Sequence, residues 1–140
     1  MTQARCVIIL VCCALLPGCG KVREAAQKAK DATELKYIGL AYLNFNDANG
    51  GKAPKNAEDL DPYLTDAPSA SKGLKDGKYV FIWGIAVMDI AKAGGTADTV
   101  IGYEKDAPTQ GGSVLFADGS VKRISAEEFK TARKAAPKTP

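Results

Sequence analysis

The chain has 140 residues, no histidine and a formal net charge of +3, so it is short enough to form a single domain. The lack of histidine excludes Ser-His-Asp and Cys-His catalysis, histidine acid–base chemistry, and zinc or copper sites that depend on imidazole. The small net charge, with no basic stripe interleaved with aromatic residues, gives no support for nucleic-acid binding.

The first residues have the layout of a bacterial lipoprotein signal peptide. Arg5 is the only charge before an apolar run over 6–16. This run has the length of a signal-peptide core and is shorter than the roughly 18–20 residues that span a bilayer. The sequence LPGC follows and is similar to a lipobox. We therefore expect residues 1–18 to be the signal peptide, with cleavage between Gly18 and Cys19 and lipidation of Cys19.

Lipidation of Cys19 would set the location of the protein. An acylated cysteine anchors the chain to a membrane, and Gly20 in the position after it is typical of an outer-membrane destination. We therefore expect an exported cell-envelope protein that faces the periplasm. The alternative is an ordinary signal, cleaved near Gly18 or Gly20, that releases a soluble product. Three of the four cysteines lie within the signal, so no disulfide is expected.

A long helix is predicted after the signal. Residues 21–34 are Ala-rich and charged, with high helix propensity, and with Cys19 they form an expected lipidated spacer over 19–34. From Leu35 onward, apolar residues recur at spacings of three and four, which predicts a core-facing stripe. The helix should end near Ala48, because the glycines that follow supply left-handed capping residues. The stripe consists of Leu35, Ile38, Tyr42 and Phe45.

The middle of the chain is predicted from turn chemistry and from β-branched and aromatic composition. Asn56 has the position of an N-cap for a short helix over 57–60. The further expected elements are a loop over 65–77, a strand over 79–83, a second strand or a short helix over 85–91, a strand over 99–104 and a loop over 105–112.

Residues 113–124 predict a β-hairpin around Asp118-Gly119, a favoured type I′ turn pair. A two-residue turn pairs Phe116 with Val121 and places Val114 on the same face. Ile124 then falls on the opposite face, so either a bulge intervenes or both faces of the hairpin are covered.

The end of the chain completes the predicted fold. Ser125 and Glu128 form an expected capping box for a last helix that ends near Arg133, and residues 134–140 are expected to be a disordered tail. Antiparallel strands after a helical start indicate an α+β class, with a long N-terminal helix packed on a small antiparallel sheet and a short C-terminal helix. The globular domain is assigned to 35–133.

Two segments carry a family resemblance. ELKYIGLAYLNFNDANGGKAPKNAEDLDPYL, residues 34–64, resembles the helix and loop of type II secretion pseudopilins and of planctomycete prepilin-like proteins that carry domain of unknown function 1559. IGYEKDAPTQGGSVLFADGSVKRIS, residues 101–125, is similar to the end segment of the prepilin-like family. The resemblance implies a pilin-like globular fold. It does not extend to filament assembly, because a lipobox replaces the assembly helix and its processing site, nor to the family's loop and turn histidines.

Three carboxylates are the candidate metal ligands. Some pseudopilins bind calcium in a loop near their C-terminus, so the resemblance implies a calcium site built from Glu104, Asp106 and Asp118, whose oxygens suit that ion. Turn chemistry accounts for Asp106 and Asp118 without a ligand. We therefore expect no cofactor, and we assign no catalytic residue.

The expected function follows from the expected location in the cell envelope and from the expected fold. We expect a non-enzymatic, lipid-anchored cell-envelope protein whose segments 65–77 and 105–112 contact another envelope component. One alternative is an accessory, pseudopilin-like subunit of a type II secretion or pilus-like system. Another is a calcium- or ligand-binding envelope module.

Overall fold

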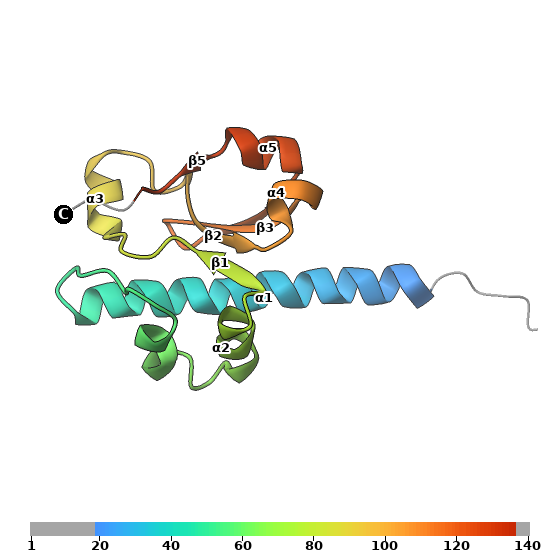
Figure 1. Cartoon of the computed structure of the whole chain (residues 1–140), viewed down its shortest axis with the longest axis horizontal. Coiled ribbons are helices and arrows are strands. Elements are labelled where there is room, and N and C mark those ends of the chain that lie inside the picture. Colours follow the sequence, from blue (N-terminus) through green and yellow to red (C-terminus); the bar gives the residue numbers. More distant parts are fainter. Residues whose placement is uncertain (1–18, 137–140) are drawn as a thin grey trace, which may run out of the picture.

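The computed structural model describes residues 19–136; the predicted signal peptide and residues 137–140 lie outside this range. A long helix packs on a small antiparallel sheet and a short helix lies near the C-terminal end, which confirms the α+β class (Figure 1). In chain order the elements are α1 (Cys19–Ala48), 3-10 helix η1 (Glu58–Tyr63), α2 (Pro68–Lys75), β1 (Tyr79–Phe81), α3 (Val87–Lys92), β2 (Thr99–Glu104), α4 (Ala107–Gln110), β3 (Gly112–Phe116), β4 (Val121–Ile124), α5 (Ala126–Thr131) and β5 (Arg133–Lys134).

Helix α1 is uninterrupted over 30 residues, so the predicted spacer and the predicted core-facing stripe belong to one helix. Leu35, Ile38 and Tyr42 are fully buried. The helix ends at Ala48 as predicted, where Gly50 adopts a φ of +65°, a conformation that glycine enters without a steric penalty. Among residues 19–136, no helix has the length and apolar character needed to cross a bilayer.

The sheet has the order β1-β2-β3-β4, with antiparallel neighbours, and β5 adds a parallel pairing to β2. Helix α1 packs against one face of the sheet, and η1 and α2 flank the helix on another side (Figure 1). Side chains alternate along each strand, so Ile101 and Leu115 join the core shared with α1. Val100 and Val114 face the other way and pack with Phe129 of α5.

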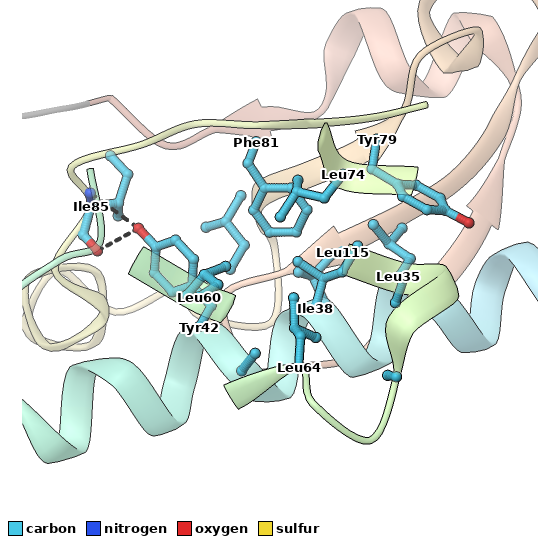
Figure 2. Packing of buried hydrophobic residues seen from close by; sticks show 14 of the residues in the cluster. Leu35, Ile38, Tyr42, Leu60, Leu64, Leu74, Tyr79, Phe81, Ile85 and Leu115 are labelled. Carbon is cyan, nitrogen blue, oxygen red and sulfur yellow. Dashed lines mark hydrogen bonds between the residues drawn. The ribbon is translucent and has the colours of Figure 1, made fainter. Parts of the chain in front are cut away.

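A buried tyrosine ties α1 to the segment after β1. The Tyr42 hydroxyl donates a hydrogen bond to the carbonyl oxygen of Ile85 at 2.8 Å and accepts one from the Ile85 amide at 3.2 Å (Figure 2). Its ring stacks on Phe81 with a centroid separation of 6.2 Å. Burial of the hydroxyl raises the pKa of Tyr42 to about 12, so it stays a neutral donor at physiological pH.

Two segments predicted as loops contain helices, so those predictions are wrong. Helix α2 occupies most of 65–77, and α4 lies within 105–112. Both start with a proline near the first helical position, where its fixed φ and missing N–H suit a helix start. For 85–91 the sequence allows a strand or a short helix, and the structure has the helix, since α3 begins at Val87. The short helix expected over 57–60 is η1, one residue later, and Asn56 accepts a hydrogen bond from the Asp59 amide at 3.0 Å.

The register of the β3–β4 hairpin differs from the prediction by one residue. Val121 pairs with Leu115 instead of Phe116, because the connection is wider than two residues. The Phe116 amide donates to the carbonyl oxygen of Ser120 at 2.9 Å, and the Ala117 and Asp118 amides donate to the carbonyl oxygens of Thr99, in β2, and Thr96, before it. A one-residue slip exchanges the faces of a strand. Val121 therefore packs toward α1 and Ile124 toward α5, which is the predicted case in which both faces are covered.

The C-terminal segment extends the sheet further than expected. The capping box is confirmed, with the Glu128 amide donating to Ser125 Oγ and the Ser125 amide donating to the Glu128 carboxylate. Helix α5 ends at Thr131, and the chain then pairs with β2. Lys134 lies in β5 and the Ala135 amide donates to the Val100 carbonyl at 2.9 Å. These residues were predicted to start a disordered tail, and that boundary is wrong because backbone pairing orders them.

Candidate functional site

Cys19 is the first residue of α1, and the N-terminal end of that helix extends beyond the sheet (Figure 1). With a rise of about 1.5 Å per residue, the first fully buried position, Leu35, lies about 24 Å along the helix from Cys19. Residues 20–27 are exposed. The predicted lipidation site is therefore followed by a helical arm that continues into the core.

An ionic cluster fixes this arm to the domain. Lys78, one residue before β1, donates to the Asp31 carboxylate at 2.7 Å and to the Glu34 carboxylate at 2.9 Å. The Tyr79 hydroxyl donates to the same oxygen of Glu34 at 2.6 Å. Lys30 approaches the other Glu34 oxygen at 3.6 Å. We call Asp31, Glu34, Lys78 and Tyr79 the arm cluster; it joins α1 to the edge strand of the sheet.

Burial gives the arm cluster its strength. Glu34 is only 5% exposed. Burial by itself raises the pKa of its carboxyl group, but hydrogen bonds from Lys78 and Tyr79 outweigh that effect and lower the pKa to about 2. The Tyr79 pKa is raised, mainly by burial and also by the hydrogen bond to Glu34. Burial lowers the pKa of Lys78, but hydrogen bonds to the two carboxylates raise it further than burial lowers it. Glu34 and Lys78 are therefore charged at neutral pH, while the Tyr79 hydroxyl stays neutral and donates.

No sequence motif marks the arm cluster, although one local signal is present. Glu34 lies four residues before Ile38, at the spacing of the core-facing stripe, so a carboxylate occupies a position that points toward the interior. A carboxylate at such a position needs a cationic or hydrogen-bonding partner. The sequence does not show which of its many lysines that partner is.

The candidate calcium ligands do not come together. Glu104 and Asp106 line a cavity of about 400 Å³ between α1 and α4, where Lys28 and Arg123 also lie. Arg123 approaches Glu104 at 3.8 Å. Asp118 lies in a different groove, beside α1, and accepts a hydrogen bond from the Ser120 amide at 2.8 Å. Within residues 19–136, no three Asp, Glu, Cys or His side chains are grouped so that they could hold a metal ion.

We expect calcium to leave the thermal stability unchanged. An ion that binds the native state stabilises it in proportion to the logarithm of its concentration. Because Asp118 lies apart from Glu104 and Asp106, and Lys28 and Arg123 lie beside those two, millimolar calcium should shift Tm by less than about 1 °C. Thermal unfolding with calcium chloride, compared with magnesium chloride and a chelator, measures this. A calcium-specific rise of several degrees would establish an ion site that these side chains do not explain.

Comparison with known proteins yields no relatives: no described protein family, no curated protein and no solved structure matches the chain.

Proposed function

We propose that this chain is a non-enzymatic, lipid-anchored cell-envelope protein whose α+β domain has a binding or structural role. The observation that best supports the proposal is the position of Cys19. The cysteine of the LPGC sequence is followed by unbroken helix, since the described part of α1 runs from Cys19 into the hydrophobic core without a break. A lipid on Cys19 would thus be joined to the domain by a rigid helix.

The arm cluster supports the same proposal. A tether of flexible chain would let the domain turn freely at the membrane, whereas Asp31 and Glu34 fix α1 to β1 through Lys78. The domain would then keep a constant orientation relative to the helix that carries the lipid. Helices α2 and α4, which replace the two predicted loops, are the segments we propose for contact with another envelope protein.

Replacing the predicted acylation site should release the protein from membranes. We expect the full-length protein, expressed in a bacterium with a lipoprotein pathway, to enter the detergent phase of a cloud-point extraction. The Cys19→Ser variant should enter the aqueous phase or remain unprocessed, because serine lacks the thiol that is acylated and hydrocarbon burial is the anchoring energy. Intact mass spectrometry of the membrane form should show a chain that starts at Cys19 and carries acyl groups.

Gly20→Ser is the matched control, because it alters the neighbouring exposed position and keeps the thiol. It should partition as the wild type does. If the wild type and Cys19→Ser both enter the aqueous phase, or if the mass of the membrane form shows no acyl groups, the lipid anchor is refuted.

A role as an accessory subunit of a type II secretion or pilus-like system is the second candidate. It is favoured by the arrangement of α1 along an antiparallel sheet, which is the layout that the resemblance of residues 34–64 and 101–125 implies. Affinity purification of the tagged protein from membranes tests it. Recovery of secretion or pilus components in fixed proportion supports this role, and their absence from a membrane-bound complex contradicts it.

A further inference from the structure

Helix α1 has a second stripe of mainly apolar and small residues, opposite the face that packs in the core; Lys36 and Asp47 are its charged positions. Its positions alternate at spacings of four and three, which is the pattern of a coiled-coil seam. We call these positions the outer seam. They are Val22, Ala26, Ala29, Thr33, Lys36, Leu40, Leu43 and Asp47.

The outer seam is exposed in an unusual way for a surface helix. Such a helix normally presents charged residues opposite its buried stripe. Here Val22 is 70% exposed and Leu40 is 54% exposed, with Tyr37 beside the seam at 50%. The charged residues of the N-terminal half, such as Arg23 and Lys30, lie off the seam. Tyr37 and Leu40, together with the partly buried Leu43, gather exposed apolar surface on the second half of the helix, and such surface indicates a binding site.

A groove runs beside the seam at the centre of the helix. It has a volume of about 460 Å³ and is bounded by the turn at Asp118-Gly119. Leu43 is half-buried against this turn, since a Cβ atom added to Gly119 would lie 3.2 Å from the leucine side chain. The other lining residues are Thr33, Lys36, Tyr37 and Leu40. The groove follows the helix, so a second helix with small side chains would fit along it.

Such a helix is present in the same chain. The N-terminal end of α1 extends beyond the sheet (Figure 1), and its exposed seam positions include Ala26 and Ala29. The alanines keep this part of the helix thin, so that it can approach another helix closely. Each copy thus has both a groove beside Leu40 and a slender helical segment.

From this complementarity we infer that a second copy of the chain binds at the outer seam, with its α1 antiparallel. In that orientation each outer-seam residue of one copy faces an outer-seam residue of the other, which gives four different pairs. In two of these pairs an alanine faces a leucine. The pairs are Val22 with Asp47, Ala26 with Leu43, Ala29 with Leu40, and Thr33 with Lys36.

Charge favours the antiparallel orientation as well. Asp47 of one copy lies next to Lys21 and Arg23 of the other, and no ion pair within residues 19–136 occupies any of these three side chains. A parallel pair in register would place Lys36 against Lys36 and Asp47 against Asp47, and like charges in a seam are destabilising. It would also leave gaps where alanine faces alanine.

The association is measured with the full-length protein in detergent. By sedimentation equilibrium at up to about 100 μM, the wild type should have the mass of two chains. Leu40→Glu should weaken the dimer by at least about 100-fold, because it removes two apolar contacts and introduces two charges per dimer. Leu40 is half exposed in the monomer, so the circular dichroism spectrum should stay unchanged, and Tm should fall only by the stabilisation that the second copy supplies.

Met88→Glu is the matched control, since Met88 is 59% exposed on α3, away from the seam. It should leave the dimer intact. A wild type that stays monomeric over the whole concentration range overturns the inference. Equal weakening by Met88→Glu and Leu40→Glu also overturns it, because the seam would then have no special part in association.

The orientation is tested by photocrosslinking and by charge exchange. With benzoylphenylalanine in place of Tyr37, the band of doubled mass should contain a crosslink to residues 31–36 of the second copy. A crosslink within 37–52 indicates parallel helices and overturns the antiparallel arrangement.

Asp47→Lys should weaken the dimer, and adding Lys21→Glu and Arg23→Glu should restore it; failure of this rescue contradicts the charge pairing.

The outcome is independent of the lipid anchor. Cys19→Ser should dimerise as strongly as the wild type, so loss of membrane binding and loss of dimerisation are distinguished by that variant. In the antiparallel dimer the two Cys19 residues lie about 45 Å apart along the helix pair. If both carry lipid, they reach one bilayer only when the two α1 helices lie along its surface.

Discussion

Replacing Lys78 with methionine should lower the free energy of unfolding by about 2–3 kcal/mol at pH 7. The change keeps an unbranched side chain but leaves the carboxylates of Asp31 and Glu34 without their shared ammonium group. Glu34 is nearly inaccessible to water, so water cannot replace the lost partner. The estimate is below the range for fully buried pairs because Lys78 itself is 38% exposed. Urea denaturation followed by circular dichroism measures the effect.

Lys75→Met is the matched control for this prediction. Lys75 pairs with Asp61 at 2.7 Å, with both side chains more than 40% exposed, and exposed pairs contribute little. The expected loss is at most about 0.5 kcal/mol. If the two variants lose equal stability, burial is not the source of the strength of the arm cluster.

The pH dependence follows from the same carboxylate. The pKa of Glu34 is lowered from its ordinary value of 4.5 to about 2 in the folded chain, so its contribution is complete above about pH 4.5 and is lost as the pH falls toward 2. That contribution is about 3 kcal/mol. The difference in unfolding free energy between the wild type and Glu34→Gln should therefore shrink over this interval. A constant difference would mean that the charge of Glu34 does not stabilise the fold.

Gly102→Val is expected to cost about 3 kcal/mol. A Cβ atom at this position of β2 would lie 2.7 Å from the ring of Phe81, on the paired strand β1. That ring cannot move aside, because Tyr42 and Trp83 pack against it at centroid separations of 6.2 and 5.6 Å. Differential scanning calorimetry should show a Tm lowered by about 10 °C or more.

The clash explanation is tested by relieving it. In a Phe81→Leu background, Gly102→Val should cost less than it does in the wild type, because leucine leaves more room above β2. Gly20→Val is the control, since no atom lies within 4 Å of the Cβ position at Gly20. If the double variant loses the sum of the unfolding free energies that the two single variants lose, crowding against Phe81 is not the cause.

The elements that the sequence predicts well are those that a local signal specifies. The core-facing stripe of α1 is confirmed because its period is helical and its end carries glycines with positive φ. The strand over 99–104 matches β2, whose residues are β-branched or aromatic in the main. The capping box at Ser125 is confirmed because it depends on side chains only three residues apart.

The features that sequence reasoning missed depend on contacts between distant segments. The hairpin register follows from bonds that the Ala117 and Asp118 amides make to Thr99 and Thr96, and no local pattern reports them. Strand β5 is ordered because it pairs with Thr99 and Val100, the first residues of β2. The arm cluster joins α1 to Lys78, more than forty positions later in the chain. The pairing of Glu34 with one lysine among many is fixed only by the fold.

The two candidate sites depend on different kinds of signal. Lipidation of Cys19 depends on a contiguous sequence motif and stays a prediction. The grouping of Glu104, Asp106 and Asp118 required an arrangement in space that the sequence does not fix, and the third residue lies in a different groove. Turn chemistry at Asp118 accounts for its side chain through the Ser120 amide.

The continuity of α1 determines how the molecule bears a mechanical load. A force that pulls on Cys19 travels along the helix axis and reaches the sheet as shear, because α1 lies lengthwise against it. The attachments at Lys78, Leu115 and Ile85 then resist the force together instead of opening one after another. A chain with this construction yields at a higher force when drawn by its N-terminal end than when a strand is peeled from the edge of the sheet.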